Sequence, residues 1–119
     1  MSKEKIEMLV QEFADASAQF EHFSSTEQYK ITNKYAKKMH SIYKKIKGIG
    51  DDGRDELAKL MYSDNKGIAK MAAVYSLAYR TEDALKVLEE IANLSGALGT
   101  SAKHAIARWN EGEWHLDEE

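Results

Sequence analysis

Apolar residues recur along most of this chain at steps of three and four, the spacing of one face of an α-helix. In the first segment the pattern runs from Ile6 through Phe13 to Phe20. Five further segments repeat it, and no stretch shows the sustained alternation of apolar and polar residues that is typical of a strand. The pattern predicts helices and no sheet, with helices over about 3–23, 26–47, 52–62, 66–79, 82–93 and 100–111.

Two of these helices have unusual faces. In 26–47 the apolar residues, among them Met39 and Ile46, fall within an arc of about 80°, and most lysines lie on the opposite side. In 66–79 apolar residues surround the axis, and Lys70 is the one charge between residues 67 and 79. Because a helix that is apolar on every side is typically buried, we expect 66–79 to lie between other helices.

Gly48, Gly50 and Gly53 spell a formal G-x-G-x-x-G. A dinucleotide-binding loop requires this motif after a strand, whereas here it follows a lysine-rich helix. We therefore interpret the glycines as the end of one helix, a turn and the start of the next.

Capping residues mark most of the other boundaries. Side chains of Ser, Thr, Asp and Asn accept hydrogen bonds from the free amides of a helix start, and glycine commonly follows a helix end. The expected signals are a capping box of Ser24 with Glu27 or Ser25 with Gln28, a cap at Asp64 or Asn65, a cap at Thr81, a break at Gly96 and Gly99, and an end at Gly112.

The second half of the chain looks duplicated. Leucine and alanine positions of 52–79 recur in 82–111, at an offset of 31 residues for the first helix and 33 for the second. The difference between the two offsets falls in the loop that joins the two helices. The matches pair Leu57 and Leu60 with Leu88 and Ile91, and Ala69, Ala72 and Ala73 with Ala102, Ala105 and Ile106. A repeated helix–turn–helix unit predicts an all-α fold, an α–α superhelix of stacked antiparallel helix pairs that forms a single domain over 1–119.

Residues 60–77, LMYSDNKGIAKMAAVYSL, resemble a HEAT repeat, with a helix, an Asp/Asn turn, an aliphatic residue and a pair of alanines. Where that repeat usually carries arginine, this chain has Ala69 followed by Lys70. The usual ladder of Asp–Arg pairs is therefore not expected here.

Three further segments extend the resemblance to a family of small, uncharacterised bacterial HEAT-like proteins. They are NKYAKKMHSIYKKIK (33–47), TEDALKVLEEIA (81–92) and SAKHAIARWNEGEW (101–114). The resemblance implies an all-helical superhelix with no assigned activity. It also implies, for some relatives, a role as an immunity protein beside a bacterial toxin.

Composition is that of an ordinary globular protein. Of the 119 residues, 43% are hydrophobic and 31% charged, and the chain has no cysteine. The missing thiols exclude disulfides, thiolate zinc sites, iron–sulfur clusters and cysteine nucleophiles. Charges fill the first fifteen residues, and no apolar run approaches the ~20 residues that cross a bilayer. We therefore expect a cytoplasmic protein with no membrane partner.

Charge is distributed unevenly. The net charge is −3, yet residues 28–50 hold seven lysines and no acid, which leaves −10 for the rest. Such a helix either is a solvated face or binds nucleic acid or another anionic partner. Arginine, the residue best suited to bases and phosphates, occurs only three times, which favours the solvated face.

No residue set predicts an enzyme, and we expect no cofactor or metal. The histidines His22, His40, His104 and His115 do not pair at the spacing of metal ligands, and no G-x-S-x-G motif occurs. Neighbouring carboxylates such as Glu89 and Glu90 point apart on a helix.

One constellation is a candidate recognition surface. In a stacked array the second helices of successive pairs line the same side, and Tyr, Arg and His are common in protein interfaces. The residues expected on that side are Tyr75, Tyr79, His104, Arg108 and Glu111, extended by His40, Lys37 and Lys44. The alternative is that the tyrosines pack between helices and Arg108 pairs with Glu111.

The sequence therefore predicts a non-enzymatic protein-binding module, with a toxin domain as the most concrete partner. The alternative is a nucleic-acid-binding module that uses the lysine-rich helix at 28–47.

Overall fold

A computed structural model describes residues 3–24, 26 and 28–112. The described residues form six α-helices and one short 3₁₀ helix, and they contain no strand. The elements are α1 (Lys3–Ser24), α2 (Tyr29–Ile49), α3 (Asp51–Lys59), η1 (Leu60–Tyr62), α4 (Lys66–Ser76), α5 (Thr81–Ala92) and α6 (Ala97–Asn110).

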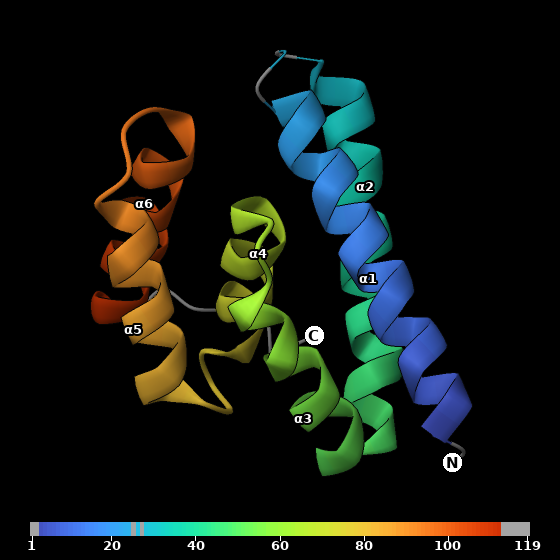
Figure 1. Cartoon of the computed structure of the whole chain (residues 1–119). Coiled ribbons are helices and arrows are strands. Elements are labelled where there is room, and N and C mark those ends of the chain that lie inside the picture. Colours follow the sequence, from blue (N-terminus) through green and yellow to red (C-terminus); the bar gives the residue numbers. More distant parts are fainter. Residues whose placement is uncertain (1–2, 25, 27, 113–119) are drawn as a thin grey trace.

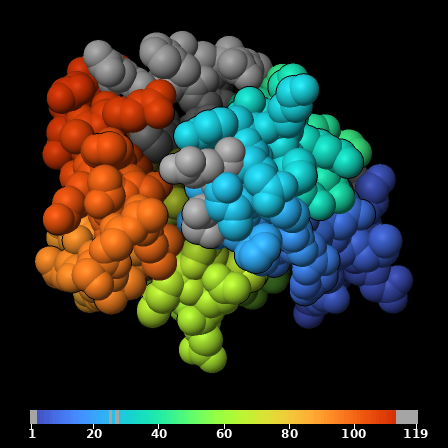
Figure 2. Space-filling view, turned by 90° about the horizontal axis from the view of Figure 1, so that it is seen from above, coloured from blue at the N-terminus to red at the C-terminus, as the bar shows by residue number. Residues whose placement is uncertain are grey.

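The helices stack as three antiparallel pairs (Figure 1). The pairs are α1 with α2, α3–η1 with α4, and α5 with α6. The all-α fold of stacked helix pairs is thereby confirmed. In both Figure 1 and Figure 2, the pair α5–α6 and the pair α1–α2 lie on opposite sides of the molecule, with α4 between them.

Helix α4 belongs to two hydrophobic cores. On one side its Met71 and Tyr75 pack with residues of α1, α2 and α3, including Phe13 and Ile46. On the other side its alanines pack with α5 and α6, where Leu88 is fully buried. The expectation that 66–79 is enclosed is therefore correct for the helical part. Positions that the internal repeat relates are also buried alike: Leu57 and Leu88 are both buried, and so are Ala69 and Ala102.

A single glycine joins the first two pairs. Gly50 ends α2 and caps α3 with a φ of +103°, a conformation that L side chains rarely adopt. Gly53 lies in the first turn of α3, where a Cβ would stand 2.6 Å from the carbonyl oxygen of Ile46. The structure thus confirms that the glycine motif is a helix junction.

The expected start of the second helix is wrong. Helix α2 begins at Tyr29 rather than near residue 26, and its N-cap Gln28 makes no side-chain capping bond. Ser24 is the last residue of α1, and its hydroxyl donates to the carbonyl oxygen of Phe20 at 2.7 Å. Ser25 and Glu27, the other members of the expected capping box, lie outside the described residues.

Other helix ends differ by a few residues. Asn65 caps α4 as expected, since its Oδ1 accepts from the amides of Gly67 and Ile68. Helix α4 ends at Ser76 rather than 79, because the chain turns there into α5. Thr81 is no cap, because its hydroxyl donates to the carbonyl of Leu77.

The last helix is longer than expected. It begins at Ala97 directly after Gly96, whose φ is +87°, and Gly99 lies inside it. Gly112, with a φ of +76°, follows its end as expected. Trp114 and His115 lie outside the described residues.

One buried charge ties three helices together. Lys70 on α4 is only 3% exposed. Its ammonium forms an ion pair with Glu21 of α1 and donates to the hydroxyl of Ser101 on α6 at 2.9 Å. A buried ammonium needs such partners, which explains how one lysine fits into an otherwise apolar helix.

Candidate functional site

Tyr75 lies in the interior. Its side chain is 8% exposed, and its ring meets Phe13 edge-on at 5.3 Å and Tyr43 at 4.8 Å between ring centroids. Offset and edge-to-face contacts of this kind stabilise a core. The expectation of an exposed Tyr75 is therefore wrong, because α4 is enclosed by its neighbours, and the alternative of packing between helices holds for this residue.

Tyr79 lies beyond the end of α4, in the turn that leads to α5. Its hydroxyl donates to Asp55 Oδ1 at 2.8 Å, and Arg80 donates to the same oxygen at 2.6 Å. The guanidinium groups of Arg54 and Arg80 lie 4.9 and 5.1 Å from the centre of its ring. Tyr79 therefore fastens the α4–α5 turn to α3 through hydrogen bonding and cation–π contacts.

The same cluster shifts the pKa values of its members. The hydrogen bonds from Arg80 and then from Tyr79 stabilise the carboxylate and lower the pKa of Asp55. The bond to Asp55 in turn raises the pKa of Tyr79 and that of Arg80. These shifts favour an ionised Asp55, a charged Arg80 and a neutral Tyr79, the states in which the hydrogen bonds that hold the turn are formed.

Three predicted residues of α2 meet Tyr75 at one shallow hollow. Lys37, His40 and Lys44 line it together with Tyr75, Ala36 and Ser41. The two lysines are exposed, while His40 is half-buried with its ring 6.2 Å from that of Tyr75. The structure thus brings together four of the eight predicted site residues.

The predicted residues of α6 form a separate exposed strip. His104, Arg108 and Glu111 are all exposed, and within residues 28–112 Arg108 and Glu111 make no ion pair. Helix α6 lies across α4 from α2 (Figures 1 and 2). The eight residues therefore occupy three places, namely the α2 hollow, the Tyr79 turn and the α6 strip.

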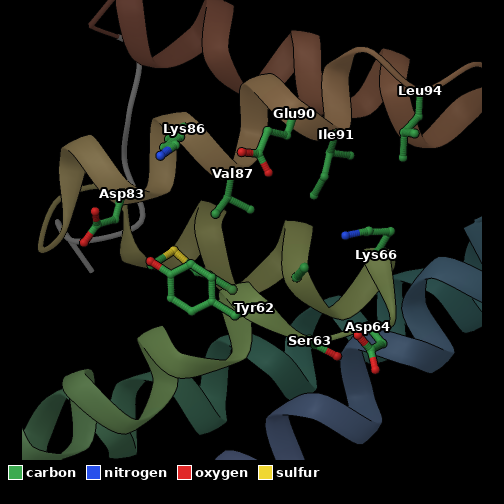
Figure 3. Close-up of a pocket in the computed structure, with 12 residues that line it drawn as sticks. Tyr62, Ser63, Asp64, Lys66, Asp83, Lys86, Val87, Glu90, Ile91 and Leu94 are labelled. Atoms are coloured by element: carbon green, nitrogen blue, oxygen red, sulfur yellow. The ribbon is translucent and has the colours of Figure 1, made fainter.

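A groove that the sequence pattern did not reveal lies between η1–α4 and α5 (Figure 3). It encloses about 490 Å³, within the size range of ligand-binding clefts. Buried or nearly buried apolar side chains form its floor, including Met61, Val87 and Ile91. Tyr62 is 67% exposed and Leu94 is 43% exposed, so two large apolar side chains flank that floor.

Charges of both signs surround the floor. Asp64 lies in the turn before α4, Lys66 begins α4, and Asp83, Lys86 and Glu90 come from α5 (Figure 3). Within the described part of the chain, none of these five side chains has a hydrogen bond or an ion pair. The groove therefore combines an apolar floor with polar groups that are available to a bound molecule.

The groove was missed because its walls come from segments that lie apart in the sequence. Its lining residues belong to η1, to the start of α4 and to α5, and the periodicity of one helix does not show how it packs against another. Continuous helix to residue 62 was expected, whereas Leu60–Tyr62 form a 3₁₀ helix, with Met61 in the core and Tyr62 exposed. The aromatic Tyr62, directly before the Ser63–Asn65 turn, was the available signal.

Two kinds of feature are absent from the part of the chain that the structure describes, namely a cluster of metal ligands and a membrane-spanning helix. Among residues 3–24, 26 and 28–112, no three His, Cys, Asp or Glu side chains gather as they would around a metal ion. No helix in this described part is both long and apolar enough to cross a membrane.

Comparison with known proteins supports the fold alone. No family model and no curated protein matches the chain. The structure is similar to the crystal structure of the protein RPA1889 from Rhodopseudomonas palustris CGA009, with a TM-score of 0.81. The two chains are 22% identical, and the match covers 90% of this chain and 89% of the other. At that identity the likeness shows a shared arrangement of helices.

Proposed function

We propose that this chain is a non-enzymatic protein-binding module of the HEAT-like type, and that a segment of its partner binds in the groove between η1–α4 and α5. The observation that carries the proposal is the exposed pair Tyr62 and Leu94 beside an apolar floor. Large apolar side chains that border a cleft are typical of interaction sites.

The chemistry of the groove suits a polypeptide. Tyrosine is enriched among the residues that contribute most to protein–protein affinity. An apolar side chain of the partner would bury Val87 and Ile91, while the unpaired charges of Lys66 and Glu90 would bond its polar groups. Charges at such a rim contribute more to orientation and specificity than to affinity.

The resemblance to small bacterial HEAT-like proteins, which implies an immunity role for some relatives, gives the proposal its most specific form, in which the partner is a toxin domain. Stacked helix pairs support this version because such arrays commonly present extended binding surfaces. Co-expression would then restore growth to cells that carry the toxin. A cytoplasmic location is part of the same proposal, and fractionation of the native cell tests it.

A photo-crosslinking amino acid tests the groove directly. Placed at Tyr62 or Leu94, it should capture the same protein in the native cell. Tyr29 is the matched control, because it is 70% exposed and lies at the start of α2, away from the groove. Capture at position 29 alone, or at none of the three, would contradict the proposal.

Affinity measured with the purified partner completes the test. Tyr62→Ala should weaken binding by about tenfold or more, as expected for a tyrosine at the centre of an interface. Tyr29→Ala should change the Kd less than about twofold, since exposed residues outside an interface contribute little. Equal effects of the two substitutions would place the partner elsewhere on the molecule.

A further inference from the structure

The outer face of α2 is strongly basic. Six lysines of this helix are exposed, and α2 contains no acidic residue. They are Lys30, Lys34, Lys37, Lys38, Lys44 and Lys45. Within the described residues, none of the six forms an ion pair. The face, named here the lysine face, therefore presents six ammonium groups that no side chain of the described protein neutralises.

The lysines follow the helix in two rows. Lys30, Lys37 and Lys44 are spaced by seven residues along one side of Ser41, and the other three lie along its opposite side. At 100° and 1.5 Å per residue, the rows span an arc of about 120° and a length of about 22 Å. Met39 and Ile46 are buried on the reverse side, so the core holds the lysine face toward solvent.

The acidic residues of α5 lie away from this face. The acidic helix α5, with Glu82, Asp83, Glu89 and Glu90 exposed, lies across α4 from α2 (Figures 1 and 2). A polyanion bound along α2 would therefore lie on the side of the molecule away from these acids.

The composition of the lysine face favours one class of partner. The centre of a protein–protein interface is depleted in lysine and needs exposed apolar anchors. Tyr75, in the hollow beside Lys37 and Lys44, is only 8% exposed. The exposed Tyr29 is the first residue of α2, outside the two rows. A membrane-surface helix buries an apolar face in the lipid, whereas the apolar face of α2 is already buried in the protein core. Nucleic acid has no such requirement, because lysines that neutralise phosphates gain affinity from released counterions.

We propose that the lysine face binds nucleic acid through the phosphate backbone, without reading the bases. Lack of sequence specificity follows from the residue types, because the six groups are lysines, which present a point charge on a flexible stem rather than the rigid fork of an arginine. This surface is distinct from the groove proposed for the protein partner. The two proposals therefore stand or fall separately.

Fluorescence anisotropy with labelled duplex DNA, duplex RNA and single strands tests the inference. At physiological salt we expect a Kd of about 10⁻⁴ to 10⁻⁶ M that is independent of sequence, and tighter binding at ~50 mM salt. For duplex DNA the slope of log Kobs against log salt should lie between about −3.6 and −5.4, as expected for four to six phosphate contacts. Comparison of the DNA, RNA and single-strand arms identifies the preferred source of phosphate.

Two triple variants with the same net charge separate the lysine face from overall charge. The test variant carries Lys30→Gln, Lys37→Gln and Lys44→Gln, and the control carries Lys3→Gln, Lys59→Gln and Lys103→Gln, three exposed lysines outside α2 and outside the groove. The test variant should bind at least about tenfold more weakly, with a salt slope reduced by about 2.7, while the control changes less than about twofold. Replacement of the same three α2 lysines by arginine should preserve binding.

Several results would overturn the inference. They are the absence of binding to any nucleic acid at ~50 mM salt, equal losses in the two triple variants, and equally tight binding of poly-glutamate or of vesicles rich in anionic lipid. Circular dichroism confirms that each variant keeps its helices, so a loss of binding cannot be assigned to unfolding.

Discussion

At the scale of single residues, Asp55 shows how polar contacts replace apolar packing at a turn. Its carboxylate accepts from both Tyr79 and Arg80 and so joins α3 to the start of α5. These groups are exposed to solvent, which screens their charges, so we expect a modest contribution to stability. The direction in which this contribution changes with pH is nevertheless defined, because both hydrogen bonds favour the ionised form of Asp55 and lower its pKa.

Asp55→Asn should therefore destabilise the protein at neutral pH and have little effect in acid. A carboxylate whose pKa is lowered on folding stabilises the fold above its unfolded pKa, here about 3.8, and this contribution disappears as the pH falls through the lower folded pKa. Urea denaturation at pH 7 should show a lower midpoint for the variant, and the gap between variant and parent should begin to close below about pH 4 and disappear below the folded pKa of Asp55. Asp64→Asn is the control, because Asp64 is exposed and makes no ion pair in the described part of the chain. A gap that widens in acid would contradict this role.

At the scale of helices, glycine positions determine how closely the elements meet. A Cβ at Gly99 would lie 1.9 Å from the carbonyl oxygen of Leu94, a backbone atom that cannot move aside. Gly48 also lies inside a helix, but a Cβ there would meet nothing within 4 Å. The two glycines therefore offer a matched test of close approach.

Gly99→Ala should destabilise the protein by about 2–3 kcal/mol, the usual cost of forcing extra atoms into a packed site. Gly48→Ala should stabilise it by about 0.5–1 kcal/mol, because alanine restricts the unfolded chain without strain in the helix. Urea denaturation of both variants and the parent chain measures the difference. Similar free energies of unfolding for the two variants would show that the α5–α6 turn is not tightly packed.

Helices and their buried faces were predictable because many residues contribute to each pattern. Helix ends were less predictable, because one side-chain bond can decide them. Ser24 and Thr81 look like caps in the sequence, yet each hydroxyl donates to a carbonyl oxygen four residues earlier. The candidate site was the least predictable, since the groove depends on how α5 packs against η1 and α4, and burial of Tyr75 follows from the enclosure of α4 on both sides.

At the scale of the whole molecule, α4 separates two surfaces of different character. The lysine face of α2 is basic and lacks apolar anchors, whereas the groove beside α5 is apolar with mixed charges. Both figures place these two helices on opposite sides of α4. Sites that share no contacts usually contribute independently to binding and stability.

We therefore expect the two surfaces to bind their partners at the same time. Tyr62→Ala should leave the Kd for nucleic acid within about twofold, and the α2 triple variant should leave the affinity for the groove partner equally unchanged. When Tyr62→Ala is combined with the α2 triple substitution, the change in binding free energy for each partner should equal the sum of the separate changes within about 0.5 kcal/mol. Anisotropy titrations of labelled duplex, with and without saturating groove partner, measure this directly. Release of the duplex by the groove partner would show that the two surfaces overlap or are coupled through α4, because a partner confined to the groove would not reach α2.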